Sequence, residues 1–205
     1  MFNERELIEG CKQKDPTAQH LLYERYADIM YGLCYRYVSN PEDLRDVVHD
    51  GFIKVYDSIK RYKGDGSFEG WMKRLFINTA ITFWKKSVMN NKTVRLDNLQ
   101  LFKETADDDV RDGIDESDLD EGTVNYDIVS SAGFSQEELL QALQTIPEPF
   151  RMVFNLSCIE GMKHEEIGEM LGIDTSTSRT RLARARTMLQ KELYRMCVKK
   201  VTTAN

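Results

Sequence analysis

Apolar side chains recur at helical spacing through the first 91 residues. One stripe comprises Leu22, Tyr26, Ile29, Leu33 and Tyr37, and a second comprises Leu44, Val48, Phe52, Val55 and Ile59. Steps of three and four residues place side chains on one face of an α-helix, so each stripe predicts a helix with one buried face. Between the stripes, Asn40 can cap the second helix and Pro41 suits its first turn.

A third helix is predicted through residues 71–86, after the glycine-containing loop 63–67, with Ser67 as its cap. Its core stripe is expected to be Met72, Leu75, Phe76 and Phe83. Lysine and arginine are interleaved here with Trp71 and Trp84, which suits single-stranded nucleic acid, because bases stack on aromatic faces while cations neutralise phosphates. The alternative is that both tryptophans are core or half-core residues and the basic residues form a solvated face.

The pattern after residue 134 predicts a helix-turn-helix. Ser135 and Glu138 fit a capping box, and Pro147 and Pro149 separate that helix from the next. A short helix then turns Ile167, Met170 and Leu171 inward and is stopped by Gly172, since glycine adopts the left-handed conformation at low cost. A second helix follows after a turn of about three or four residues, with Thr175 or Ser176 as its cap.

The second helix of this motif has two contrasting faces. At about 100° per residue, one face collects apolar residues and the opposite face small, polar and basic ones. The apolar set is Leu182, Ala185, Leu189 and Leu193; the opposite set is Thr180, Ala183, Arg184, Thr187 and Lys191, flanked by Arg179, Arg181 and Arg186. The polar face suits the major groove of duplex DNA, although an ordinary amphipathic surface helix is the alternative. Ser178 falls in the apolar stripe, where its hydroxyl needs a partner such as a carbonyl one turn back.

The net charge of -6, taken as a whole, argues against a nucleic-acid partner. The charges are, however, distributed unevenly along the chain. Residues 92–134 hold 4 basic and 12 acidic side chains, whereas residues 175–205 hold 8 basic and 1 acidic. The acidic stretch lacks sustained periodicity and predicts a flexible linker. We therefore expect an all-α fold with two helical domains, 1–91 and 135–205, joined by a flexible acidic linker over 92–134.

Several classes of protein are disfavoured by the sequence. The sequence contains no run of 18 apolar residues, so it predicts no membrane span. Its start also lacks the pattern of a signal peptide, so we expect a cytoplasmic protein. The four separated cysteines fit reduced thiols. His20, His49 and His164 have no metal-ligand spacing, and no H-E-x-x-H, P-loop or nucleophile motif is present. We expect no enzyme, no catalytic residue, no metal, no cofactor and no small-molecule substrate.

Three stretches together resemble bacterial sigma-70-family factors of the extracytoplasmic-function (ECF) type. Residues 7–59 are similar to the start of region 2, residues 62–86 to its promoter-reading end, and residues 146–189 to region 4. The resemblance implies a promoter-specificity factor that binds core RNA polymerase, recognises the -10 and -35 elements and promotes transcription initiation. A two-domain helix-turn-helix regulator that acts without being a polymerase subunit is the alternative.

The resemblance also implies roles for particular residues. Contact with the clamp of the largest polymerase subunit would involve Asp46, His49, Asp50, Phe52 and Tyr56. Recognition of the -10 element would involve Asp65, Phe68, Trp71, Arg74 and Asn78, with Lys85 and Lys86 on phosphates. Recognition of the -35 element would involve Arg179, Thr180, Ala183 and Arg184, with Thr177, Arg181 and Arg186 mainly on phosphates.

Further partners follow from the same resemblance. The second domain would hold the flap of the second-largest subunit, and an anti-sigma factor would inhibit the protein. The acidic linker would thread a polymerase channel built for RNA. Neutralising Asp107, Asp108 and Asp109 is then expected to alter initiation and not the fold.

Overall fold

The computed structural model describes residues 3–90 and 133–203, and these divide into two compact helical units. All regular elements in the described ranges are helical, which confirms the all-α, two-domain prediction. The linker predicted at 92–134, with Asp107 to Asp109, lies outside the described residues except for its last two positions. In the described ranges, no helix is both long enough and apolar enough to span a membrane.

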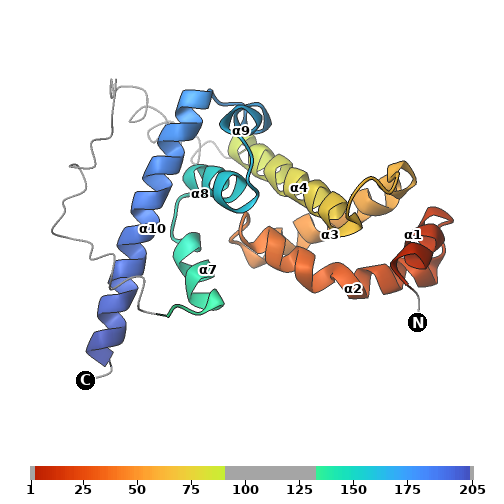
Figure 1. The fold of residues 1–205 in the computed structure, drawn as a ribbon, viewed down its shortest axis with the longest axis horizontal. Coiled ribbons are helices and arrows are strands. Elements are labelled where there is room, and N and C mark those ends of the chain that lie inside the picture. The colour runs from red at the N-terminus through yellow and green to blue at the C-terminus, as the bar shows by residue number, and fades with distance from the viewer. Residues whose placement is uncertain (1–2, 91–132, 204–205) are drawn as a thin grey trace. The chain divides into compact units, whose positions relative to one another are not determined.

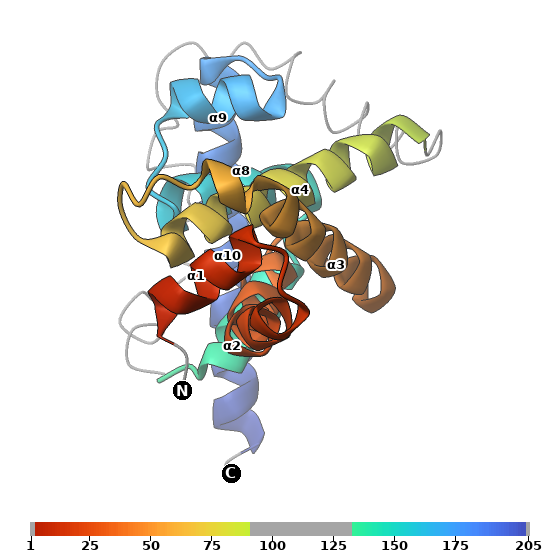
Figure 2. The ribbon, with the colours of Figure 1, turned by 90° about the vertical axis from the view of Figure 1, so that its right-hand side faces the viewer.

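The N-terminal unit, residues 3–90, contains four α-helices and one short 3₁₀ turn. They are α1 (Glu4–Lys12), α2 (Pro16–Tyr35), α3 (Pro41–Ser58), η1 (Ile59–Arg61) and α4 (Phe68–Asn90). Helix α1 packs on α2, and α2, α3 and α4 pack on one another (Figures 1 and 2). The predicted caps are present: the Asn40 side chain accepts from the amides of Glu42 and Asp43, and the Ser67 hydroxyl accepts from Gly70.

The two predicted apolar stripes lie in the core of this unit, with one exception. Every residue predicted in the second stripe is buried, but Ile29 of the first stripe is 43% exposed. Met30 is fully buried in its place, because the buried face of α2 steps from Tyr26 by four residues to Met30 and then by three to Leu33. The prediction of Ile29 as a core residue is therefore wrong by one position.

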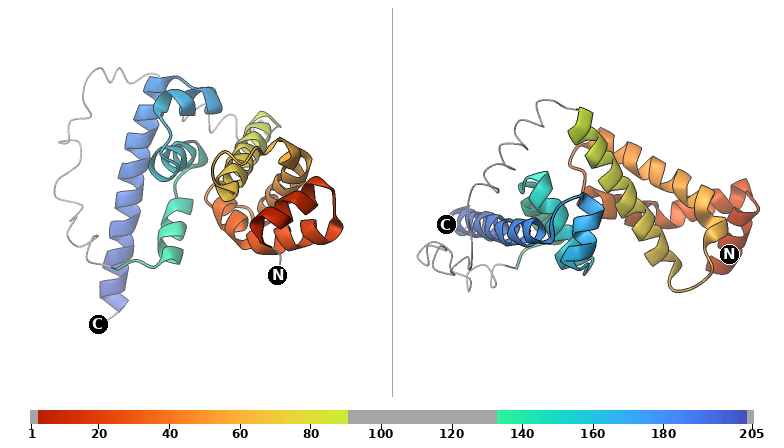
Figure 3. Two further views of the ribbon diagram at one scale, coloured as in Figure 1. Left: turned by 45° about the vertical axis from the view of Figure 1, so that its right-hand side comes forward. Right: turned by 90° about the horizontal axis from the view of Figure 1, so that it is seen from above.

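Helices α3 and α4 approach closely at Gly51. A Cβ atom at this position would lie 2.4 Å from a ring carbon of Phe76, so any larger side chain would displace the ring. The neighbouring Phe52 meets Phe76 edge to face, with 5.1 Å between ring centroids. These contacts hold α3 beside α4 (Figure 3).

The C-terminal unit, residues 133–203, is built around one long helix. Its elements are α7 (Gln136–Gln144), α8 (Glu148–Phe154), the π-helical turn η3 (Asn155–Ile159), α9 (His164–Leu171) and α10 (Thr175–Thr203). Helix α10 packs against α7, α8 and α9, with α9 beside its N-terminal end (Figures 1 and 3). Ser135 and Glu138 form the predicted capping box, and a core cluster contains Leu143, Ile146, Phe150 and Ala185.

Candidate nucleic-acid and polymerase interfaces

The loop before α4 is held in a defined shape by its own residues. Gly64 and Gly66 have φ values of +87° and +98°, a region that side chains with a Cβ rarely adopt. The hydroxyl of Tyr62 donates to the carbonyl of Gly66 at 2.7 Å and closes the loop. Asp65 is exposed between the two glycines. The loop therefore presents a carboxylate and bare backbone at a fixed place beside α4.

Three aromatic rings, Tyr62, Phe68 and Trp71, form an aromatic ledge next to this loop. Tyr62 lies 5.2 Å from Phe68 and 5.4 Å from Trp71, and Phe68 stacks on Trp71 at 5.5 Å between centroids. Phe68 is only 1% exposed, whereas Tyr62 and Trp71 are half-buried. This burial corrects the expectation that Phe68 meets DNA directly: its ring supports the other two. Tyr62 was missed by the sequence analysis, although an aromatic residue beside a glycine loop was the available signal.

The remaining -10 candidates lie along the outer side of α4. Arg74 and Asn78 are exposed and follow Trp71 at steps of three and four residues, so the three side chains share one face. Lys85, half-buried, continues this face, and Lys86 is exposed beside it. The face also includes Thr82, whose hydroxyl donates to the Asn78 carbonyl at 2.7 Å and which the sequence analysis did not select.

The two tryptophans of α4 have different environments. Trp84 is 7% exposed and belongs to the core, whereas Trp71 keeps part of its ring accessible on the aromatic ledge. The alternative interpretation, core or half-core, therefore fits the burial of both tryptophans, and the accessible part of the Trp71 ring remains available for stacking. Lys73 forms an ion pair with Glu69 at 2.7 Å, so its charge is partly neutralised within the helix.

The helix-turn-helix has the predicted geometry with two refinements. Gly172 ends α9 with φ +73°, in the left-handed region as expected. Helix α10 already begins at Thr175, so Asp174, and neither Thr175 nor Ser176, occupies the capping position. A Cβ at Gly168 would lie 2.7 Å from the carbonyl oxygen of Ile173, so this glycine lets the turn pack directly on α9.

The predicted apolar side of α10 faces the unit, with Leu182 and Ala185 buried and Leu189 and Leu193 half-buried. The -35 candidates on the accessible surface are the exposed Arg179 and Arg186 and the half-buried Thr177, Thr180, Ala183 and Arg184. The guanidinium of Arg186 also lies 3.7 Å from the Cys158 sulfur. Most of the predicted basic face is thus available to a ligand.

The predicted phosphate contact of Arg181 needs correction, because its side chain is only 2% exposed and cannot reach a phosphate in this conformation. Burial lowers the pKa of its guanidinium to about 10, so the group still carries its charge at neutral pH. Helices α8 and α9 both pack on α10, and its buried side includes Arg181 as well as Leu182 and Ala185. Arg181 is therefore part of the interior of the C-terminal unit.

Ser178 is fully buried, as its place in the apolar stripe predicts. Its hydroxyl oxygen lies 2.8 Å from Nδ1 of His164, the first residue of α9. The expected partner, a carbonyl one turn back, is therefore replaced by a side chain of the preceding helix. Spacing along α10 alone could not identify this partner, which is 14 residues earlier in the chain.

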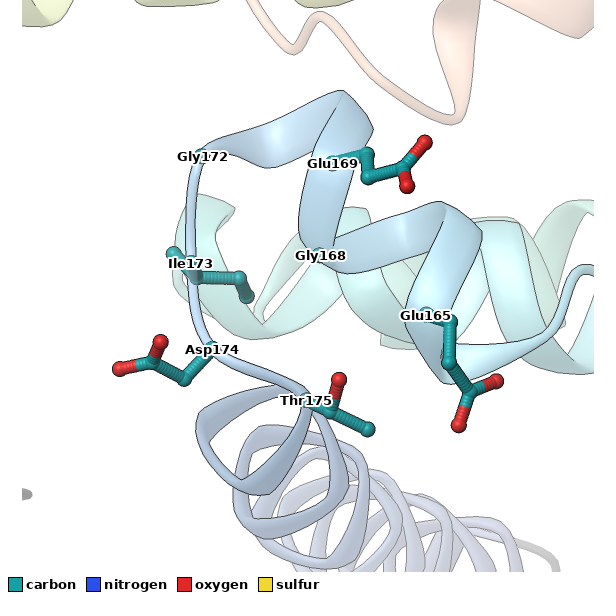
Figure 4. A pocket seen from close by; sticks show the side chains of 7 residues that line it. All are labelled: Glu165, Gly168, Glu169, Gly172, Ile173, Asp174 and Thr175. Atoms are coloured by element: carbon teal, nitrogen blue, oxygen red, sulfur yellow. The ribbon is translucent and has the colours of Figure 1, made fainter.

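A shallow hollow of 460 Å³ lies between α9 and the turn (Figure 4). Its lining includes the carboxylates of Glu165, Glu169 and Asp174. Glu165 also lies 3.8 Å from the guanidinium of Arg179, and both side chains are exposed. Carboxylates repel phosphates, so the hollow is unsuited to the DNA backbone, and the basic side chains of α10 remain the candidate contacts.

The outer face of α3 carries the candidates for polymerase contact. Asp46, His49 and Asp50 are exposed at helical spacing, and the face continues with Ile53, which is 44% exposed. The sequence analysis missed Ile53, although its spacing from His49 and Asp50 placed it on the same face.

Two aromatic candidates on α3 turn away from that face. Phe52 is 3% exposed and packs against Tyr23 at 4.7 Å between centroids, so it supports the face without being part of it, which corrects the expectation of direct contact. Tyr56 is half-buried, and its hydroxyl donates to the Gln19 carbonyl at 2.9 Å. Burial raises the pKa of this phenol to about 12, so it stays neutral at physiological pH.

Two cysteine thiols of the N-terminal unit are buried. Burial raises the pKa of the Cys11 thiol to about 11 and that of Cys34 to about 12, which keeps both protonated and unreactive. Within residues 3–90 and 133–203, no group of three or more His, Cys, Asp or Glu side chains could hold a metal ion.

Each of the two units matches a known protein family. Residues 22–88 match the family Sigma-70 region 2, and residues 136–189 match Sigma-70, region 4. The chain is 31% identical over 193 residues to the ECF RNA polymerase sigma-E factor of Haemophilus influenzae, covering 94% of this chain and 96% of that protein. It is 30% identical over 172 residues to the ECF RNA polymerase sigma factor SigE of Mycolicibacterium smegmatis, covering 84% of this chain and 60% of that longer protein. A solved structure of the sigma factor RpoE in complex with the anti-sigma factor NepR from Bartonella quintana matches with a TM-score of 0.47 and 16% identity, covering 85% of this chain and 95% of that chain.

Proposed function

The chain belongs to the ECF sigma factors of the sigma-70 family, the promoter-specificity subunits of bacterial RNA polymerase, and from this premise we propose how its two units divide the task. The protein binds RNA polymerase and directs it to promoters. A regulator that works without polymerase is not favoured, because both sigma regions match and the similarity extends over nearly the whole chain. The polymerase carries out the chemistry, and this subunit contributes no catalytic group.

The N-terminal unit captures the melted -10 element. The supporting observation is the aromatic ledge beside a loop of fixed shape, with Arg74 and Asn78 exposed on the adjoining face of α4. An unstacked base can stack on Trp71 or Tyr62 while Asn78 reads its edge and Lys85 and Lys86 neutralise the strand. Removing a base from the duplex costs a few kcal/mol, and stacking returns about 1–3 kcal/mol per base.

The C-terminal unit reads the -35 element as duplex. Arg179, Thr180, Ala183 and Arg184 are the base-reading residues on the accessible side of α10, with Thr177 and Arg186 on phosphates. Arginine can donate two hydrogen bonds to one guanine edge, which is worth about 1–3 kcal/mol of discrimination. Arg181 is left out of this set because it is buried.

Protein partners use other faces. The clamp of the largest polymerase subunit binds the outer face of α3 through Asp46, His49, Asp50 and Ile53, where acidic groups adjoin an exposed apolar side chain. The flap of the second-largest subunit binds the C-terminal unit, on which Leu139 and Ile159 are each 44% exposed. An anti-sigma factor that covers the α3 face would inhibit by competing with the clamp.

Transcription in vitro tests this division. Purified core polymerase supplemented with the full chain is expected to initiate at selected genomic promoters, where core alone does not. Substituting both Asp46 and Asp50 with lysine, which reverses two exposed charges, should reduce holoenzyme assembly, while binding of the isolated chain to -35 duplex persists. Absence of stimulation at every genomic promoter would contradict the proposed function.

A further inference from the structure

The first turn of α10 carries a polar residue in the face that packs on the rest of the C-terminal unit. Ser178 is fully buried, and the next residues on this face are Leu182 and Ala185. An apolar side chain could fill such a position by burial alone, whereas a buried hydroxyl destabilises the fold unless it is hydrogen-bonded. Its partner at 2.8 Å, His164, comes from the other helix of the motif.

A hydrogen bond to a buried hydroxyl constrains the two helices differently from an apolar contact. Apolar surfaces tolerate small slides and rotations, whereas the buried Ser178 hydroxyl reaches the His164 ring in one arrangement of the two helices. A buried polar residue fixes the register of a coiled coil in the same way. The bond therefore restricts the rotation of α10 about its own axis relative to α9. Helix α9 is itself packed closely against the loop that connects it to α10, because the Ile173 carbonyl of that loop lies against Gly168.

Rotation of α10 matters because its outer side chains have to meet base edges at fixed places. Side-chain atoms lie about 6 Å from a helix axis, so turning the helix by about 10° moves them by about 1 Å. Productive recognition tolerates displacements of about 0.5 Å. Arg179 directly follows Ser178, and Arg184 lies less than two turns further along the same helix, so both are sensitive to this rotation.

We propose that His164 and Ser178 are positioning residues for -35 recognition: the hydrogen bond between the buried Ser178 hydroxyl and the half-buried His164 ring sets the rotation of α10 and so sharpens its choice of bases. The inference rests on the proposed reading of the -35 element by α10. It adds a residue of α9, His164, which need not touch DNA, to the determinants of promoter specificity.

Selection of promoter sequences by the holoenzyme tests the proposal. The library has a randomised -35 segment and a constant -10 element. His164→Ala and Ser178→Ala are each expected to lower the preference for the best base over the next by about fivefold, and the double variant to lower it no further. His164→Asn places a hydrogen-bonding atom close to the position of Nδ1 and should retain most of the preference.

Two controls separate positioning from general damage. Ser176→Ala removes an exposed hydroxyl from the same turn and should leave the selected sequences unchanged. Melting temperature is measured for every variant. A lowered melting temperature with unchanged base preference would overturn the proposal, because the hydrogen bond would then serve stability alone.

The Arg184→Ala variant separates a failure of this proposal from a failure of the proposed -35 reading by α10. If Arg184→Ala changes the selected -35 sequence but neither His164→Ala nor Ser178→Ala does, the positioning proposal fails and the proposed reading by α10 stands. If Arg184→Ala and the other α10 surface variants also leave selection unchanged, the proposed -35 reading fails, and the positioning proposal with it.

Discussion

The two units present their candidate DNA surfaces with different chemistry, although both are helical. On the N-terminal unit, aromatic rings and a glycine loop lie together, with cations further along α4. On the C-terminal unit, threonine and arginine side chains project from one continuous helix, while Phe150 lies in the core cluster and Phe154 packs against it. Stacking surfaces are useful for bases that have left the duplex, whereas a narrow basic helix is useful in an intact groove. The difference between the two surfaces thus follows the state of the DNA that each would meet.

Removing the aromatic ledge should have the largest effect and should be confined to melted DNA. Replacing Tyr62 and Trp71 together with alanine removes two stacking surfaces of about 1–3 kcal/mol each, so open complex should fall by at least about thirtyfold. Permanganate reactivity of promoter thymines measures the opening. Substituting Tyr31, an exposed aromatic residue of α2, serves as the control. An equal loss of binding to -35 duplex would remove the distinction between the units.

Arg184→Ala tests the other unit. Loss of a bidentate contact should weaken binding to -35 duplex about tenfold and relax selection at one base position. Opening of promoters saturated with holoenzyme should change less. Arg195→Ala is a matched control, because Arg195 is an exposed arginine of the same helix that pairs with Glu192 at 3.1 Å. Equal effects of the two substitutions would indicate a general charge effect instead of reading by Arg184.

Salt dependence should separate the two surfaces more finely. Arg186→Ala should reduce the slope of log affinity against log salt by about 0.9 on duplex DNA, as expected for one lost phosphate contact. Lys86→Ala should reduce the slope by about 0.7 on single-stranded -10 DNA. Binding titrations of each variant at several salt concentrations, on duplex and on single-stranded DNA, measure these slopes. Identical slope changes on either DNA for both variants would contradict the division of roles.

The smallest effect on DNA binding is expected at Arg181. Because its guanidinium is buried, Arg181→Met should leave the salt slope on duplex DNA unchanged, while the melting temperature shifts. Arg186→Ala provides the contrasting variant on the same helix. A slope reduced to the same extent in Arg181→Met would mean that the buried side chain swings out to phosphate on binding.

Periodicity and capping chemistry predicted most of this fold, since stripes, caps and the glycine stop depend on neighbours along the chain. Prediction failed where burial of a position depended on how much of the helix surface is covered, as at Ile29 and Arg181. At Phe52 the spacing predicted burial correctly, and only the direct contact with polymerase that the resemblance implied had to be corrected. It also failed where partners come from separate elements. Neither the Tyr62 ring on Trp71 nor the His164 bond to Ser178 has a signature in local spacing. The sequence therefore predicted which helix faces carry the candidate surfaces better than it predicted the individual side-chain contacts on them.

The missing side chain at Gly51 has a consequence for engineering. Because the Phe76 ring occupies the space where a Cβ would stand, the helix proposed to dock on polymerase and the helix proposed to hold the melted strand are packed directly against each other. A change of backbone on either helix is passed to the other through that contact. Chimaeras that exchange α4 between sigma factors to alter promoter choice should therefore carry α3 with it, and their junctions are better placed before Pro41 and after Asn90 than between the two helices.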